Sequence, residues 1–188
     1  MKEVKLYHKK ENKKTECYTC AHRCIISPGK QGICGVRENK DGVLYSLVYG
    51  KTIAANADPI EKKPLFHFLP GSLSFSIATA GCNMHCRNCQ NADISQLPKK
   101  RENIVGKEFL PDQVIQVALQ NNCATIAYTY TEPSIFWDYA CDTAKLARQQ
   151  EIKNVFVTNG YFSKESFLEI SKFMDAANVD LKSFRDKT

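Results

Sequence analysis

Three cysteines, Cys82, Cys86 and Cys89, lie within eight residues in the stretch GCNMHCRNC and offer three thiolates to a metal. A structural zinc site is closed by four ligands, so one interpretation adds His85 or a distant residue to the three thiolates. A bacterial ferredoxin run has the spacing C-x2-C-x2-C-x3-C, whereas the gaps here are three and two and no fourth cysteine follows nearby. The spacing favours a [4Fe–4S] cluster in which three thiolates hold three irons. The fourth iron would then stay open for a substrate or cofactor, as the fourth position of a catalytic zinc does.

A second group of four cysteines lies nearer the N-terminus, at Cys17, Cys20, Cys24 and Cys34. Four thiolates can close a zinc site, in which the metal contributes folding energy. A second [4Fe–4S] cluster that passes electrons to the first is equally compatible with four cysteines, and unligated thiols are a third alternative. Cys123 and Cys141 stand alone, and we expect both to be buried thiols, since free cysteine packs as a small hydrophobe.

Strand and helix patterns that could position these groups alternate beyond Gly71. Strands are expected at 73–79, 124–130, 154–160 and 179–183. Helices are expected from Pro111, with Val114, Ile115, Ala118 and Leu119 on one face, from Ser134 to about Gln150, and after the N-cap Ser163. Such alternation predicts an α/β fold with parallel βα units, either an open sheet or a barrel.

The carboxyl ends of these strands carry the residues that look functional. The cysteine triplet follows the first strand, and the segments TEP (131–133), TNG (158–160) and Lys182 lie at the ends of the later ones. Ligands gather at this edge in parallel α/β folds. Four parallel strands do not close a barrel, and a bare last strand is an exposed edge, so we expect the sequence to be the N-terminal part of a longer protein.

Length and composition allow one globular domain with a small appendage. The chain has 188 residues, 43% hydrophobic and 24% charged, and contains no apolar run long enough for a membrane span. The charged N-terminus lacks the apolar segment of a secretory signal, so we expect a cytoplasmic protein. We divide it into a cysteine-rich N-terminal region and connector (1–70) and a (β/α) domain (71–188), truncated at its C-terminus. Residues 1–16 are interpreted as a polar lead-in and 57–72 as an irregular connector.

The net charge of +6 comes largely from six lysines in the first fourteen residues. A solvated segment is the simpler interpretation, and this charge does not establish binding to nucleic acid.

Five segments taken together resemble one enzyme family: DPIEKKPLFHFLPGS, GCNMHCRNCQN, YTYTEP, VTNGY and DLKS. They are similar to the radical S-adenosylmethionine (SAM) superfamily, in the branch related to pyruvate formate-lyase activating enzymes. The nearest likeness is to the radical SAM enzymes of the AmmeMemoRadiSam system, over residues 17–185. The resemblance implies a partial TIM-like (β/α) barrel and an oxidoreductase that uses a [4Fe–4S] cluster and SAM. Reductive cleavage of SAM would give a 5′-deoxyadenosyl radical that abstracts a hydrogen atom from a protein or small-molecule substrate.

The same resemblance assigns roles to individual residues. Cys82, Cys86 and Cys89 would be cluster ligands, with SAM on the open iron. Glu132 stands where the family has a glycine-glycine-glutamate segment that meets the SAM amino group. Positions facing SAM are matched by Asn159, Asp180 and Lys182. Structural alternatives exist for three of these residues: a cap or ion pair for Glu132, and a mutual ion pair for Asp180 and Lys182. His67 and His85 are expected to be packing or surface residues.

Two departures from the family pattern stand out. Asn88 occupies the position before the third cysteine, where the family has an aromatic residue; a backbone contact to adenine is compatible with this change. Tyr130 and Thr131 replace the two glycines before Glu132, which makes close backbone approach there less certain.

The resemblance also implies partners: an electron donor such as flavodoxin or ferredoxin, a protein or small-molecule substrate, and for an activase-like role a glycyl-radical protein. Neither a membrane nor nucleic acid is expected to be a partner. The rival hypothesis is a zinc-stapled nucleic-acid or protein binding module without catalysis, which would be colourless and bind zinc at both cysteine groups.

Overall fold

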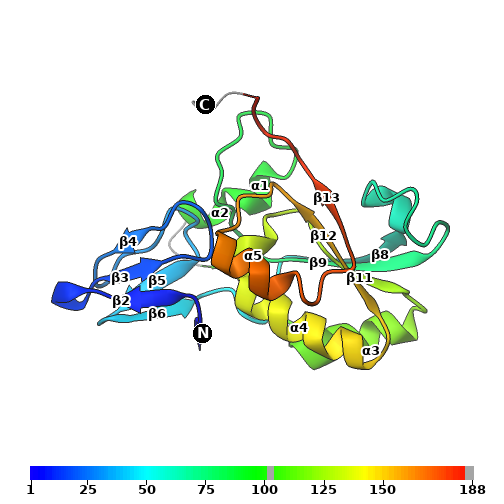
Figure 1. Ribbon diagram of the computed structural model, residues 1–188, viewed down its shortest axis with the longest axis horizontal. Coiled ribbons are helices and arrows are strands. Elements are labelled where there is room, and N and C mark those ends of the chain that lie inside the picture. The colour runs from blue at the N-terminus through cyan, green and yellow to red at the C-terminus, as the bar shows by residue number, and fades with distance from the viewer. Residues whose placement is uncertain (101–103, 185–188) are drawn as a thin grey trace.

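An open sheet of five strands, in the order β13-β12-β11-β9-β8, forms the centre of the protein (Figure 1). The computed structural model describes residues 1–100 and 104–184, and all structural statements below concern these residues. The strands are β8 (Ala54–Pro59), β9 (Leu73–Ala78), β11 (Thr125–Tyr128), β12 (Lys153–Thr158) and β13 (Ala176–Val179). The last four of these strands are parallel, which confirms the βα order predicted from the sequence.

The prediction that residues 57–72 form an irregular connector is wrong for residues 57–59, because these residues belong to strand β8. It pairs antiparallel with β9, with Ala54 opposite Ala78 and Pro59 opposite Leu73. Proline lacks an N–H to donate, and it is tolerated here because it ends an edge strand. The edge of the parallel sheet is thus covered by an antiparallel strand, followed by the 3-10 helix η2 (Ile60–Lys62).

Strand β13 lies earlier than the predicted 179–183. Its register runs from Ala176 opposite Val155 to Val179 opposite Thr158, where β12 itself ends. The backbone N–H of Asp180 still donates to Thr158 O at 2.8 Å, and among the described residues the pairing of β13 with β12 ends there, so Asp180 and Lys182 follow the strand instead of lying in it.

Three helices lie together on one side of the sheet (Figure 1). They are α3 (Pro111–Gln120), α4 (Trp137–Gln149) and α5 (Lys164–Ile170), and a 3-10 turn, η3 (Pro133–Phe136), leads directly into α4. The predicted N-cap is confirmed, since the side chain of Ser163 accepts a hydrogen bond from Ser166 N at 3.0 Å. Val114, Ile115 and Ala118 are buried on the inner face of α3, as predicted. The prediction is wrong for Leu119, which is 47% exposed.

The main core lies between these helices and the sheet, and it includes Phe75, Ile77, Tyr128 and Phe156. The opposite face of the sheet is covered by residues 60–70, where Ile60 packs against Ala127 and Val155. The described strands form no closed barrel, so the predicted partial TIM-like barrel is observed only as an open parallel sheet with helices.

The N-terminal region forms two small antiparallel sheets instead of the expected polar lead-in. One holds β1 (Lys2–Glu3), β6 (Val43–Ser46) and β5 (Arg37–Lys40), and the other β2 (Tyr7–Lys9), β3 (Thr15–Cys17) and β4 (Ile25–Ile26), with a 3-10 turn η1 (Glu11–Lys13). The segment is ordered because Val4 and Leu6 are buried. Leu6, Val36 and Val48 belong to the same core as the residues of the sheet and its helices. The division into 1–70 and 71–188 remains a prediction.

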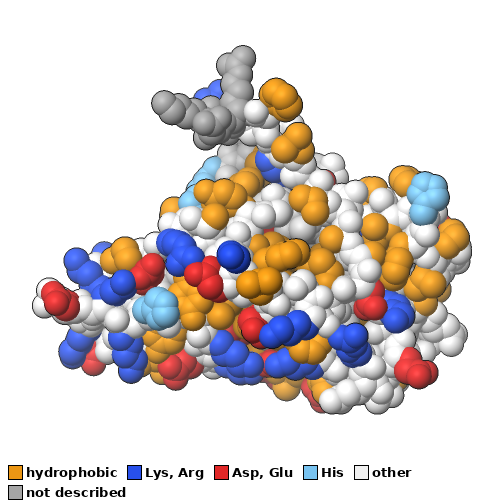
Figure 2. Space-filling view, viewed as in Figure 1, with side chains coloured by type: hydrophobic (Ala, Val, Ile, Leu, Met, Phe, Trp, Pro, Cys, Tyr) orange, Lys and Arg blue, Asp and Glu red, His pale blue; other side chains and the backbone are white. Residues whose placement is uncertain are grey.

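Lysines of the first fourteen residues form ion pairs with carboxylates elsewhere in the chain. Lys2 pairs with Asp142 at 2.5 Å, Lys10 with Glu16 at 2.6 Å and Lys13 with Asp41 at 2.7 Å. Figure 2 accordingly shows basic and acidic side chains interspersed over the N-terminal strands.

The remaining short elements are β7 (Lys51–Thr52), β10 (Lys107–Glu108), α1 (Ala92–Ser95) and α2 (Leu97–Lys100). Strand β10 pairs with β7. Among the described helices none is long and apolar enough to cross a membrane. Residues 101–103 and 185–188 of the predicted 71–188 domain lie outside the described residues.

Candidate functional site

A cavity of about 700 Å³ opens at the carboxyl ends of the parallel strands. It is large enough for a drug-sized ligand. All eight residues that the sequence assigned to the triplet site and SAM line it, namely Cys82, Cys86, Asn88, Cys89, Glu132, Asn159, Asp180 and Lys182. The fold therefore brings together groups from four separate segments of the chain.

The loop after β9 contains Gly81, directly before Cys82, and this glycine has a positive φ of 102°. A Cβ on Gly81 would stand 2.7 Å from Cγ1 of Val36 and 3.0 Å from the carbonyl oxygen of Cys34. Only glycine tolerates both this backbone conformation and this approach. The loop that carries the cysteine triplet is thus held directly against the N-terminal cysteine region.

Hydrogen-bond donors stand beside two sulfur atoms of the triplet. The backbone N–H of Met84 donates to Sγ of Cys82 at 3.4 Å, and the Ser95 hydroxyl lies 3.5 Å from Sγ of Cys89. Donors of this kind stabilise thiolates and tune a cluster that they hold.

The three thiols line one space that is large enough for a cluster. Within the described residues no three His, Cys, Asp or Glu side chains stand close enough together to hold one metal ion, and this holds for both cysteine groups. In a cuboidal cluster each thiolate binds a different iron, so the three sulfurs need only line one space, as they do here.

Asn83 is the residue that the sequence interpretation missed. It is 1% exposed, and its side-chain oxygen accepts from Asn159 Nδ2 at 2.8 Å while its Nδ2 donates to the Ser134 hydroxyl at 3.3 Å. Its backbone oxygen accepts from the ring Nε2 of His22 at 2.8 Å. The only sequence signal was its position directly after Cys82.

Glu132 is buried and both of its carboxylate oxygens accept hydrogen bonds. Oε1 accepts from Ser134 N at 3.0 Å and from the Thr158 hydroxyl at 2.8 Å, and Oε2 accepts from Asn159 N at 2.8 Å. The structural alternative is therefore present, since Glu132 caps η3. Burial raises the pKa of the Glu132 carboxyl, and these hydrogen bonds act in the opposite direction.

Tyr130 keeps the backbone shape that a glycine would favour. Its φ is +62°, in the left-handed region that side chains rarely adopt. Its hydroxyl donates to Asp58 Oδ2 at 2.8 Å, its carbonyl accepts from Asn91 Nδ2 at 2.8 Å, and Lys63 Nζ lies 4.8 Å from the ring centroid. These contacts hold the strained residue, so a tyrosine in place of a glycine at this position does not remove the turn.

Asp180 and Lys182 form an ion pair of 2.8 Å at the rim of the cavity, and both side chains are more than a third exposed. The hydrogen bond that Lys182 donates to Asp180 is the main cause that raises the pKa of Lys182. Asn88 is exposed, as are His67 and His85, in keeping with surface histidines.

The four N-terminal cysteines line a second, much smaller cavity of about 20 Å³, which also touches Asn83, Ser134 and Ile135. Burial raises the pKa of the Cys20 thiol to about 12 and that of Cys34 to about 11. Cys123 and Cys141 are buried, as predicted.

Comparison with known proteins gives one family and two relatives. The model of the radical SAM superfamily matches residues 76–188. An uncharacterized protein of Methanocaldococcus jannaschii is 43% identical over 186 residues, which cover 99% of this chain and 55% of that protein. The 4-hydroxyphenylacetate decarboxylase activating enzyme of Clostridium scatologenes is 24% identical over 104 residues, 52% of this chain and 33% of that enzyme. The chain thus spans about half or less of the length of these relatives.

Proposed function

Because the chain belongs to the radical SAM superfamily, we propose that Cys82, Cys86 and Cys89 hold a [4Fe–4S] cluster and that SAM binds in the cavity they line. When bound and reduced, the cluster supplies the electron that cleaves SAM to methionine and a 5′-deoxyadenosyl radical, which abstracts a hydrogen atom from the substrate. The observation that supports this function best is that eight residues from four segments share one cavity of about 700 Å³.

Glu132 would orient the amino end of SAM. An ionised carboxylate has about four acceptor positions, and three at Glu132 are occupied by Ser134 N, Thr158 Oγ1 and Asn159 N. One acceptor position remains for an ammonium group in the cavity. The three internal donors fix the carboxylate before the ligand arrives, which reduces the ordering that binding requires.

Asp180 and Lys182 would contact the more exposed part of SAM. Their mutual ion pair stands at the cavity rim, where either charge can exchange its partner for a polar group of the ligand at little cost, because exposed pairs are worth little. Asn88 lines the same cavity and could offer its backbone to the adenine.

For the substrate we propose an activase-like role, hydrogen abstraction from a protein, with a small molecule as the other substrate class. The match of 104 residues to an activating enzyme supports this role. The resemblance of the sequence motifs to pyruvate formate-lyase activating enzymes and to the AmmeMemoRadiSam system points in the same direction. A flavodoxin or ferredoxin would be the electron donor.

The test is anaerobic reconstitution with iron and sulfide, followed by dithionite reduction in the presence of SAM. We expect a brown protein, an electron paramagnetic resonance (EPR) signal that SAM alters, and 5′-deoxyadenosine as product. The Cys86→Ala variant is the matched control and should lose all three. A colourless wild-type protein with zinc bound at the triplet would refute the proposal and favour the binding-module alternative.

A further inference from the structure

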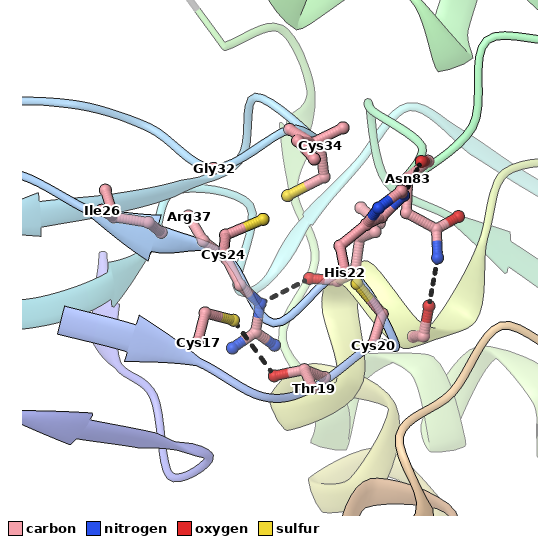
Figure 3. A pocket seen from close by; sticks show the side chains of 13 residues that line it. Cys17, Thr19, Cys20, His22, Cys24, Ile26, Gly32, Cys34, Arg37 and Asn83 are labelled. Carbon is pink, nitrogen blue, oxygen red and sulfur yellow. Dashed lines mark hydrogen bonds between the residues drawn. The ribbon is translucent and has the colours of Figure 1, made fainter.

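The small cavity among the N-terminal cysteines has the volume of one ion. Its volume of about 20 Å³ is close to that of one water-sized body. The cavity at the triplet measures about 700 Å³. A cuboidal cluster of four irons and four sulfides is far larger than one water molecule, so the two cavities differ in the kind of metal group they can take. In Figure 3 the four labelled cysteines surround this one small space.

Polar groups of the chain adjoin the four sulfur atoms. The Thr19 hydroxyl lies 3.6 Å from Cys17 Sγ, and hydrogen bonding by the backbone of His22, Ile33 and Val36 opposes the effect of burial on the pKa of Cys20, Cys24 and Cys34. Metal-bound thiolates accept such bonds, and donors of this kind orient first ligands in metal sites. Polar groups of the chain are thus placed to bond to sulfurs that a metal would hold as thiolates.

Arg37 brings a buried positive charge to the same cavity. It is 2% exposed, lines the cavity, donates from Nη2 to Asp138 Oδ2 at 2.8 Å and from Nε to Ile135 O at 3.2 Å. Its Nη1 is buried with no partner among the described residues. An unpaired buried guanidinium nitrogen is costly. Four thiolates around a divalent ion carry a net charge of −2 and would give Nη1 an anionic neighbour.

We propose that Cys17, Cys20, Cys24 and Cys34 bind one zinc ion in a closed tetrahedral site, and that this ion fixes the loop from which His22 holds the cluster-binding loop. The four thiols do not yet meet at one point, since no three ligands in the described part of the chain are close enough to share an ion. Zinc would draw the sulfurs inward to about 2.3 Å from the metal. Four thiolates leave no open position, so the ion is structural.

The positioning part follows from the hydrogen bonds around His22. His22 lies between Cys20 and Cys24, and its Nε2 donates to the backbone oxygen of Asn83 at 2.8 Å. Asn83 in turn bonds to Asn159 and Ser134, and follows Cys82 directly. The positioning role of His22 rests on the proposed function, because it assumes that the loop carrying Cys82 binds the cluster. The zinc site does not depend on that assumption.

The test uses the whole chain with the other site removed, as the C82A/C86A/C89A variant, offered zinc, iron and sulfide together under anaerobic conditions. We expect one zinc per chain and no sulfide, and cobalt(II) in place of zinc should give the absorption bands of a tetrahedral thiolate complex. Four irons with four sulfides per chain, a single iron, or no metal would each overturn the proposal. Zinc binding here together with failure of wild-type protein to bind a cluster would reject the proposed function alone.

Hydrogen exchange tests the positioning. Adding zinc to the same triple variant should slow amide exchange in the segment 80–91, and the further change H22A should keep zinc binding but lose that protection. Equal exchange with and without zinc would overturn the positioning role of the ion.

Discussion

The hydroxyl of Tyr130 donates a hydrogen bond of 2.8 Å to Asp58, a residue 72 positions earlier in the chain. Asp58 also pairs with two adjacent lysines, Lys63 at 3.1 Å and Lys62 at 2.9 Å. Strand β8 thereby supports the left-handed backbone of Tyr130 at the rim of the proposed SAM cavity. This arrangement explains how the chain keeps the turn before Glu132 without the family's glycines.

Removing the charge of Asp58 should be far more costly than removing Lys62. Lys63 is 1% exposed, so Asp58→Asn leaves a buried ammonium unpaired, at a cost of about 3–5 kcal/mol in the free energy of unfolding. The Lys62 side chain is 65% exposed, so the loss of its solvent-screened ion pair in Lys62→Ala should cost far less. Urea unfolding of both variants measures the difference, and equal losses would contradict the assignment.

Asp58 should also make stability depend on pH in the acid range. The pKa of Asp58 is lowered from 3.8 to about 2, and the hydrogen bond from Lys62 is the largest cause. Burial acts in the opposite direction, and the hydrogen bond from Tyr130 lowers the pKa further. A lowered pKa gives stability that is present above pH 3.8 and is lost as pH falls towards about 2, here about 2 kcal/mol. In Lys62→Ala the pKa of Asp58 should rise back towards 3.8, so the loss should be smaller and should be complete at a higher pH. Chemical denaturation between pH 2 and pH 5 tests this, and an unchanged profile would argue against Lys62 as the main cause.

Asn83→Ala should disturb the triplet loop much more than Asn88→Ala. Asn83 is buried and bonded on both sides of its amide, so its loss leaves Asn159 Nδ2 without that partner, at about 1–3 kcal/mol. Asn88 is exposed in the same loop, and its removal should change stability by no more than about 0.5 kcal/mol. Thermal unfolding and the EPR spectrum of the reconstituted proteins should both separate the two variants.

Glu132→Gln should lose stability even without SAM. The amide of glutamine has an NH2 group in place of one carboxylate oxygen. That group cannot accept the hydrogen bond of Asn159 N if it replaces Oε2, or those of Ser134 N and Thr158 Oγ1 if it replaces Oε1. We expect a cost of about 1–3 kcal/mol and weaker SAM binding by equilibrium dialysis. Full stability with lost SAM binding would mean that the capping contacts contribute little.

The local features of this protein are determined by the sequence itself. The spacing of Cys82, Cys86 and Cys89 depends only on adjacent residues, and the alternation of strand and helix patterns fixed the parallel order of β9, β11, β12 and β13, because side-chain periodicity is a local property. Parallel order then places the strand ends at one edge, which is why Glu132, Asn159, Asp180 and Lys182 could be predicted to lie together.

Contacts between distant segments were decided by the tertiary structure alone. Strand β8 appeared only because β9 offered an edge to pair with, and β13 ended where β12 ended. The bonds of Asn83 to Asn159 and of Tyr130 to Asp58 join residues 76 and 72 positions apart, and no pattern along the chain marks such partners. Both cysteine groups can be identified in the sequence. The sizes of the cavities that they line, about 700 Å³ at the triplet and about 20 Å³ at the N-terminal cysteines, arise from packing.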